Sequence, residues 1–198
     1  MLYGQDDVIV SGAIREVKEA RVQTEPQHGR SDGAGAPEPL PISQIAVVVK
    51  DIDEALERYH HVLGWGPWNV YEHKPPALHH TYLRGVPTDF SMIGAETHVG
   101  PIVVELLQPL DGPSIYKEWL DEHGEGLHHI AVMRPTPEES EETRRHFLEE
   151  AGAEILMEGR IGETIHFYYL DTEPALKVIF ESGTGHAVDL VPSRVYPE

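Results

Sequence analysis

The chain has 198 residues, a length that fits one substantial domain or two half-size modules sharing a core. Its net charge of −19 disfavours binding to nucleic acid and to anionic membrane surfaces. Hydrophobic residues make up 40% and no apolar run is long enough to cross a bilayer, so a soluble globular protein is expected. Because cysteine is absent, any metal must be held by His, carboxylate, amide or water.

The first 40 residues are expected to form an amino-terminal arm and a flexible linker. Residues 24–40 are rich in Gly, Pro and polar groups and nearly lack large apolar side chains. The start of the sequence shows no basic segment followed by an apolar stretch, so no secretion signal is recognised. A cytoplasmic location is therefore the expectation.

A first βαβββ module is predicted over residues 41–112. The β-branched run QIAVVV indicates a buried strand, and the spacing then becomes helical. Asp51 and Glu54 make a capping pair that opens this helix, and Gly64 ends it. The remaining strands are predicted at residues 68–72, with an extension at 79–83, then at 90–95 and 102–108.

A second module is predicted over residues 127–183, after a connecting helix within residues 113–126 that starts at Ser114 and ends at Gly124. The run HHIAVM restarts the pattern of the first module. A long helix follows, opened by Thr136 and closed by Gly152. Further strands are expected at residues 154–157, 165–170 and 176–181, and residues 184–198 form a carboxy-terminal extension. The predicted fold class is α+β.

Four polar residues occupy matching positions on strands of the two modules. They are Gln44, Glu105, His129 and Glu181. Strand alternation places each of them among inward-facing apolar neighbours, where unpaired carboxylates would be costly. One imidazole, two carboxylates and one amide suit a divalent ion such as Zn, Mn, Co, Ni or Fe and leave open positions for substrate. For a lone Gln, a hydrogen-bonded core amide is the commoner role.

Alternation also bears on the adjacent pair of histidines at the start of the second module. Only one of two successive side chains on a regular strand can point inward, and the module alignment selects His129. His128 is then assigned a structural role. On the strand expected at residues 79–83, His80 and Tyr82 share a face and are predicted to line the substrate pocket.

Three stretches closely resemble the vicinal-oxygen-chelate proteins, especially methylmalonyl-CoA epimerases. They are QIAVVVKDIDEALERYHHVLGWGPW, VVELLQPLDGPSIYKEWLDEHGEGLHHIAV and LKVIFES. The resemblance covers about residues 42 to 182 and implies two βαβββ modules that form a sheet cavity, with Glu105, His129 and Glu181 at ligand positions. The epimerases usually carry His where Gln44 stands. The set Gln, Glu, His, Glu resembles that of zinc glyoxalase I enzymes instead, and it disfavours an extradiol dioxygenase.

The expected function is that of a metal-dependent isomerase, epimerase or glyoxalase-like lyase that stabilises an enolate of a small carbonyl or carboxyl substrate. By resemblance to glyoxalases, Glu181 or its counterpart Glu105 serves as the base. The alternative is a binding protein of the antibiotic-sequestering kind, which uses the same cavity without catalysis. A homodimer is one option for the assembly, since relatives often pair modules between subunits.

Overall fold

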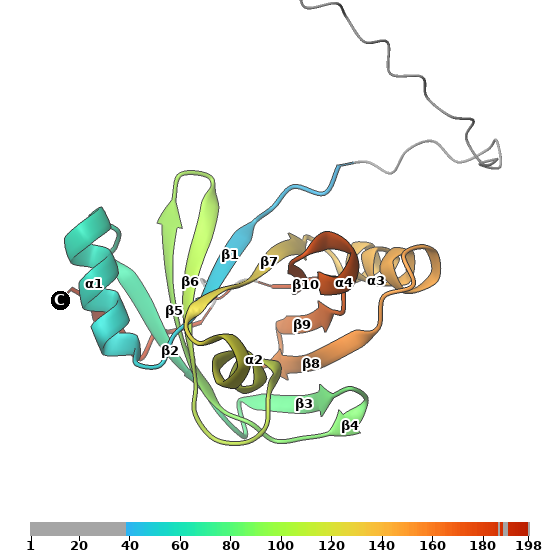
Figure 1. The fold of residues 1–198 in the computed structure, drawn as a ribbon, viewed down its shortest axis with the longest axis horizontal. Helices are drawn as coiled ribbons and strands as arrows, with labels where there is room; N and C mark the ends of the chain where they lie inside the picture. The colour runs from blue at the N-terminus through green and yellow to red at the C-terminus, as the bar shows by residue number, and fades with distance from the viewer. Residues whose placement is uncertain (1–38, 186, 188–189, 198) are drawn as a thin grey trace, which may run out of the picture. The chain divides into compact units, whose positions relative to one another are not determined.

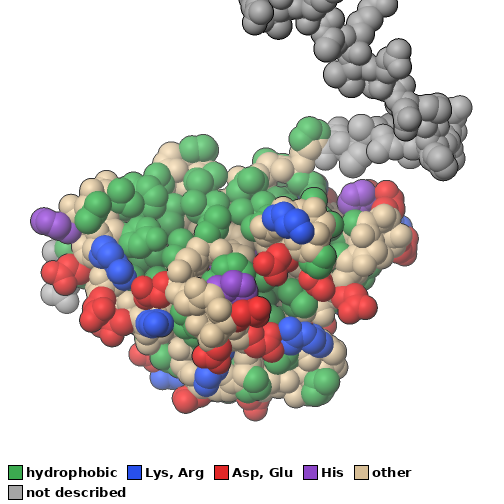
Figure 2. Space-filling view, in the orientation of Figure 1, with side chains coloured by type: hydrophobic (Ala, Val, Ile, Leu, Met, Phe, Trp, Pro, Cys, Tyr) green, Lys and Arg blue, Asp and Glu red, His purple; other side chains and the backbone are tan. Residues whose placement is uncertain are grey.

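The computed structural model describes residues 39–185, 187 and 190–197, and the predicted arm and most of the predicted linker lie outside these residues. Within the described part, eleven strands form a single curved sheet in the order β11-β2-β5-β6-β1-β7-β10-β9-β8-β3-β4 (Figure 1). None of its helices is long and apolar enough to cross a membrane. On the face drawn in Figure 2, hydrophobic side chains gather in one area, and acidic side chains are more widespread than basic ones elsewhere.

The first module consists of one helix and four strands that lie next to one another in the sheet. They are β1 (Gln44–Val48), α1 (Ile52–Leu63), β2 (Trp68–His73), β5 (Met92–Val99) and β6 (Ile102–Pro109). The predicted helix limits are confirmed, because the Asp51 side chain accepts hydrogen bonds from backbone amides of the first turn and Gly64 adopts a left-handed conformation at the end.

The second module repeats this plan after the connecting helix α2 (Ile115–His123), which begins after the N-cap Ser114 as predicted. Its elements are β7 (Gly126–Arg134), α3 (Pro137–Arg145), a π-helical turn (His146–Glu150), β8 (Ile155–Ile161), β9 (Ile165–Leu170), a short helix α4 (Glu173–Leu176) and β10 (Ile179–Thr184). The α+β fold class with two βαβββ modules is therefore confirmed.

Two additions join the modules beyond this repeat. The hairpin of β3 (Leu78–Leu83) and β4 (Val86–Pro87) belongs by sequence to the first module, yet β3 pairs with β8 of the second. At the opposite edge of the sheet, β11 (Arg194–Tyr196) from the carboxy-terminal extension pairs with β2. The second module is therefore extended by a strand from the first half of the chain, β3, and the first module is extended by β11 from the carboxy-terminal extension.

The pairing register is the same in both modules. In the parallel pairs β1·β6 and β7·β10, Gln44 lies opposite the residue two positions before Glu105, and His129 lies opposite the residue two positions before Glu181. The central strands β1 and β7 run antiparallel, with Ala46 opposite His129. A pseudo-two-fold relation between the modules thus brings the four predicted site residues to the middle of the sheet.

Alternation divides the side chains of the sheet between two faces. One face packs against the helices, with an apolar cluster under α1 that includes Leu56 and Trp68 and another under α3 that includes Phe147 and Tyr168. The other face is concave. Near α2, side chains from both modules pack together on this face and form a single hydrophobic core. The four predicted site residues lie on this concave face, beyond the edge of that core.

Two details differ from the sequence-based expectation. The last strand begins at Ile179 rather than at residue 176, because Glu173–Leu176 forms a helical turn that ends at Lys177 in a left-handed conformation. A β-bulge in β7 breaks the alternation at the two adjacent histidines. His128 and His129 are therefore both fully buried, and the expectation that only one of them points inward is wrong.

Candidate active site

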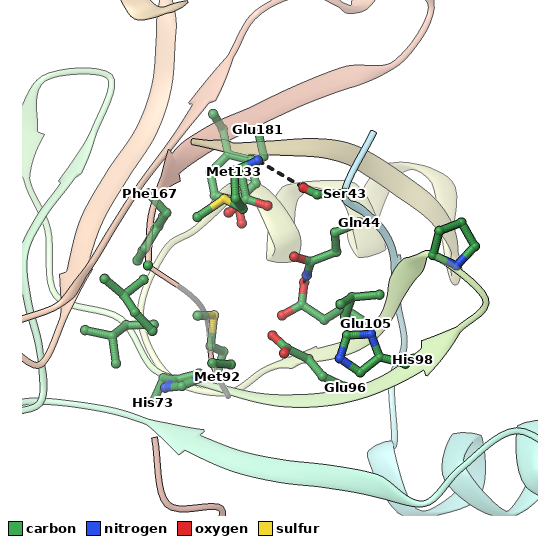
Figure 3. Close-up of a pocket in the computed structure, with 17 residues that line it drawn as sticks. Ser43, Gln44, His73, Met92, Glu96, His98, Glu105, Met133, Phe167 and Glu181 are labelled. Atoms are coloured by element: carbon green, nitrogen blue, oxygen red, sulfur yellow. Dashed lines mark hydrogen bonds between the residues drawn. The ribbon is translucent and has the colours of Figure 1, made fainter. Parts of the chain in front are cut away.

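The structure brings the four predicted site residues together. Gln44 Nε2 donates a hydrogen bond to Glu105 Oε2 at 2.9 Å. His129 Nε2 lies 3.0 Å from Glu181 Oε2 and 3.6 Å from Glu105 Oε2. In Figure 3, Gln44 and Glu105 project into the cavity from one side and Glu181 projects from the other. The four donors come from four adjacent strands, two in each module.

Burial and mutual attraction shape the protonation of this cluster. Glu105 and Glu181 keep only 8% and 7% of their surface exposed, and His129 keeps none. Burial raises the pKa of Glu105, against the lowering effect of the His129 imidazole. Burial alone would lower the pKa of His129, but the negative charges of Glu181 and Glu105 outweigh it and raise the pKa to about 9. The carboxylates that face His129 therefore favour the protonated form of its imidazole.

The two nitrogens of His129 differ in their surroundings. Nδ1 lies 2.8 Å from Nδ1 of His128, so one ring donates to the other. Nε2 is buried and, although it is close to two carboxylates, no acceptor meets it with hydrogen-bond geometry in the described part of the chain. An imidazole that faces two carboxylates through one ring nitrogen, while a hydrogen bond holds its other nitrogen, has the surroundings of a metal ligand.

The residue types of the cluster suit a divalent ion, but the side chains are not arranged to hold one. Donor atoms bonded to one zinc ion at about 2.0–2.2 Å lie roughly 3 to 3.6 Å apart, as His129 Nε2 does from one oxygen of Glu181 and one of Glu105. Across the described residues, however, no group of three His, Asp or Glu side chains stands ready to hold an ion. Instead, the carboxylates of Glu105 and Glu181 contact the His129 imidazole directly. They would have to rotate away from it before an ion could enter.

A cavity of about 340 Å³ opens above the cluster on the concave face. Gln44, Glu105 and Glu181 line it, and Ser43 stands at its edge, where its Oγ accepts a hydrogen bond from the Met133 amide at 3.0 Å (Figure 3). Apolar side chains from β8 and β9 form the opposite wall; they are Ile161, Ile165 and Phe167. The polar centre is thus bordered by a surface that suits an apolar part of a small molecule.

Glu96 on β5 is a cavity residue that the sequence analysis missed. It lies directly opposite Glu105 in the β5·β6 pairing and lines the same cavity. Burial, together with the charges of Glu105 and Glu181, raises its pKa to about 8. The signal was the alternation of MIGAETHV, in which Glu96 shares a face with Met92. The strand was predicted to end at Ala95, whereas it continues to Val99.

The structure places His80 and Tyr82 away from this cavity. Both are on β3, which pairs with the outer edge of the second module, and neither belongs to the described residues that line the cavity. The pairing is irregular between residues 79 and 82, and His80 is exposed with a positive φ. The assumption of regular alternation therefore fails on this strand, and the pocket assignment of these two residues does not describe this cavity.

Comparison with known proteins places the fold. No curated protein matches the chain. The solved structure of a hypothetical protein, BH1468 from Bacillus halodurans C-125, is 21% identical with a TM-score of 0.53 and covers 74% of this chain and 94% of that one. Methylmalonyl-CoA epimerase from Mycobacterium tuberculosis is 18% identical with a TM-score of 0.48, covering 77% and 93%. A Streptomyces coelicolor methylmalonyl-CoA epimerase variant, in complex with 2-nitronate-propionyl-CoA, is 24% identical with a TM-score of 0.47, covering 74% and 97%.

The family assignment rests on a match between sequences. Residues 43–169, more than half of the chain, match the sequence model of one superfamily. The matched region contains three of the four clustered donors, and the paired βαβββ modules agree with the fold expected from the sequence. The chain belongs to the Glyoxalase/Bleomycin resistance protein/Dioxygenase superfamily.

Proposed function

We propose that this protein is a divalent-metal-dependent isomerase, epimerase or lyase that forms an enolate from a small carbonyl or carboxyl substrate. The observation that carries the proposal is the buried Nε2 of His129, which lies 3.0 Å and 3.6 Å from the Glu181 and Glu105 carboxylates that line the cavity and makes no hydrogen bond of regular geometry among the described residues. An imidazole between carboxylates without directed hydrogen bonds is a costly arrangement for a protein that uses it only for stability. A function that needs these groups explains it.

The ligands of the proposed ion are Gln44, Glu105, His129 and Glu181. This mixed set of nitrogen and oxygen donors suits Zn, Mn, Co, Ni or Fe. When bound, such an ion supplies Lewis-acid stabilisation of the negative charge that develops on a substrate oxygen. The chain's own contribution is to hold the donors in place and to exclude bulk water, since the four side chains lie on adjacent strands with matched registers.

The reaction also needs a base that removes the proton next to the carbonyl group. Glu181 and Glu105 are the candidates within the ligand set, because either carboxylate can turn between the ion and the substrate. Gln44 holds one Glu105 oxygen by a hydrogen bond, whereas Glu181 has only its contact with His129 among the described residues. Of these two, Glu181 is therefore the more easily released.

A second candidate function is the binding of a small molecule without catalysis. The observation that favours it is the closed arrangement of the carboxylates on His129, in which no ready-made metal site exists among the described residues. The cavity and its apolar wall would serve such a protein equally well. The two functions differ in whether a metal belongs to the site.

The experiment that separates them begins with elemental analysis of the protein as purified. Unfolding is then followed with added Zn²⁺, Mn²⁺, Co²⁺, Ni²⁺ and Fe²⁺, and metal at a hundred times its Kd should stabilise the fold by about 2.7 kcal/mol. Metal-loaded protein should next catalyse exchange of solvent deuterium into α-acidic carbonyl compounds. Protein that contains no metal and gains no stability from any of these ions supports the binding protein instead.

Replacement of one ligand tests the assignment of the site. Glu181→Gln removes a charged donor, so we expect metal affinity to fall by at least ten-fold and deuterium exchange to fall with it. Isothermal titration calorimetry measures the first and NMR the second. The matched control is Glu118→Gln, whose side chain is about half exposed and pairs with Arg84 on the surface. Wild-type metal affinity in the Glu181 variant would refute the ligand set.

A further inference from the structure

We propose that His73 recognises a second polar group of the substrate, at the far end of the cavity from the ligand cluster. The substrate is then a small uncharged carbonyl compound that carries a hydrogen-bonding oxygen a few bonds from the reacting carbonyl group. This inference rests on the proposed function for the reacting end of the molecule. It adds a residue that determines specificity and narrows the class of substrate.

The sheet places His73 on the wall of the cavity. It is the last residue of β2 and lies opposite Met92 in the β2·β5 pairing, and both side chains line the cavity. Figure 3 shows His73 beside Met92, across the cavity from Ser43 and Gln44. A smaller neighbouring pocket is lined by both His73 and Ile161, a member of the apolar wall. His73 is therefore a polar side chain at the apolar end of the cavity.

The imidazole of His73 is buried without a polar partner in the described part of the chain. Only 7% of the surface of this residue is exposed. Its ring stacks on that of Tyr71, with the ring centres 5.9 Å apart, and this contact leaves both nitrogens free. An unsatisfied donor and acceptor in a buried position destabilise a protein. The arrangement therefore indicates that a polar group of a bound molecule pairs with this ring.

The charge of the imidazole limits what that polar group can be. Burial lowers the pKa of His73 to about 4, so the ring is neutral near pH 7 and offers one donor and one acceptor. A neutral ring lacks the positive charge that binds a carboxylate or phosphate. Among the described residues that line the cavity there are three glutamates and no Lys or Arg. The distal group of the substrate is therefore uncharged, such as a hydroxyl, ether or keto group.

Comparison of the two modules shows that the repeated fold does not require an imidazole here. His73 lies opposite Met92 in the first module, as Ile161 lies opposite Ile165 in the second. These pairs correspond, because Met92 and Ile165 each lie four residues before the residue that pairs with a ligand glutamate. Three of the four side chains are apolar. The imidazole is thus a feature of one half of the cavity, which gives the cavity a direction.

The floor of the cavity runs from the ligand cluster to His73 past a residue without a side chain. A Cβ added at Gly94 on β5 would lie 3.3 Å from Oε1 of Glu105 and 3.7 Å from Nε2 of His73. A molecule of a few heavy atoms can therefore reach both groups at once. The cavity volume of about 340 Å³ leaves room for a short apolar chain between the two polar ends, against the wall formed by β8 and β9.

The test compares two uncharged esters with the same reacting group, methyl 4-methoxyacetoacetate and methyl 3-oxohexanoate. The first has an ether oxygen where the second has a methylene group. Affinities are measured by NMR titration of protein labelled with ¹⁵N-histidine, as purified and again with added Zn²⁺. The wild type should bind the methoxy ester about five-fold more tightly, because its ether oxygen accepts a hydrogen bond from His73. The ring nitrogen signals of His73 should shift on binding.

Replacement of His73 should remove this preference. His73→Phe keeps an aromatic ring that stacks on Tyr71 but cannot donate a hydrogen bond, whereas His73→Gln can still donate one and should keep part of the preference. The matched control is His61→Phe at an exposed position of α1, which should bind both esters like the wild type. The urea midpoint of His73→Phe should not fall, because the substitution removes an unsatisfied polar group.

Equal affinity of the wild type for the two esters, or an unchanged preference in His73→Phe, overturns the role of His73. Binding of neither ester overturns the substrate class. Failure of the proposed function is recognised separately. A protein that holds no metal and exchanges no solvent deuterium into either ester would still prefer the methoxy ester if His73 acts as inferred.

Discussion

At the scale of single residues, the pair of adjacent histidines decides how the site is oriented. The two Nδ1 atoms lie 2.8 Å apart, so one ring must carry a proton there and the other must accept it. Burial holds the pKa of His128 well below its usual value, and this ring is therefore the neutral acceptor. His129 then donates through Nδ1, which fixes the direction of Nε2 toward the carboxylates.

Removing this acceptor should loosen the site. His128→Phe preserves the bulk of the ring but leaves the Nδ1–H of His129 buried without a partner, at a cost of about 1–3 kcal/mol in the free energy of unfolding. Loss of an outer hydrogen bond to a ligand also lowers metal affinity by roughly 10–100-fold. Urea unfolding and calorimetric metal titration measure the two effects. The control is His123→Asn, at a half-exposed ring that stacks on Trp119.

The residue scale also shows what strand alternation can predict. The structure brings Gln44, Glu105, His129 and Glu181 together as expected. For the two glutamates and Gln44, the neighbours on a regular strand reveal the inward face, whereas His129 was chosen by aligning the two modules. Glu96 escaped because the end of its strand was misplaced by a few residues. The burial of both histidines depended on a β-bulge, and a bulge leaves no local mark in the sequence that separates it from a regular strand.

At the scale of elements, the pairing of β9 and β10 leaves no room for a side chain at Gly183, two residues beyond Glu181. A Cβ at this position would overlap the backbone carbonyl oxygen of His166 on the neighbouring strand. Since backbone cannot rotate away as a side chain can, Gly183→Ala should separate the two strands and reduce the free energy of unfolding by about 2–4 kcal/mol. Urea denaturation with an unchanged m value would measure this loss.

Gly126→Ala on β7 provides the comparison for this substitution. No atom lies within 4 Å of the Cβ that would be added there, and its φ is not in the left-handed region. The expected change in stability is within about 0.5 kcal/mol. If both alanine variants proved equally stable, the close approach of β9 and β10 at Gly183 would be disproved.

The elements differ in how much of their placement a sequence can indicate. Helices α1 and α2 were predicted well because capping side chains and terminal glycines mark their ends. Strand β3 was recognised as a strand, but its partner was not, since pairing with β8 across the modules depends on the path of a long connection. The start of β10 was misplaced because the left-handed residue before it is Lys177, and not a glycine or asparagine.

At the scale of the whole molecule, the excess of negative charge extends into the cavity, which three glutamates line. In the metal-free protein, several groups at the cavity hold protons more tightly when folded than when unfolded, among them Glu96 and His129. The pKa of Glu96 is raised to about 8 by burial and by its acidic neighbours, and that of His129 is raised to about 9 by the carboxylates that face it. Each makes a contribution to stability that is complete below its unfolded pKa and declines as the pH rises.

These shifts predict a stability optimum for the metal-free protein on the acid side of neutrality. Rising pH removes the Glu96 contribution between about 4.5 and 8 and the His129 contribution between about 6.5 and 9. Falling pH acts through His73, whose pKa burial lowers to about 4, so that stability is lost from about 6.5 downward. Urea unfolding in EDTA across pH 4 to 9 should therefore show the greatest stability near pH 6.

Glu96→Gln isolates the largest part of the alkaline decline, because an amide stays uncharged at any pH. We expect the metal-free variant to exceed the wild type at pH 9 by roughly 2–4 kcal/mol, after allowance for partial contact with solvent, and to match it near pH 5. Glu57→Gln on the exposed face of α1 should leave the profile unchanged. An alkaline decline of the same size in the Glu96 variant would show that this carboxylate is already ionised in the folded protein near neutral pH, and that charge repulsion in the cavity is relieved without a metal.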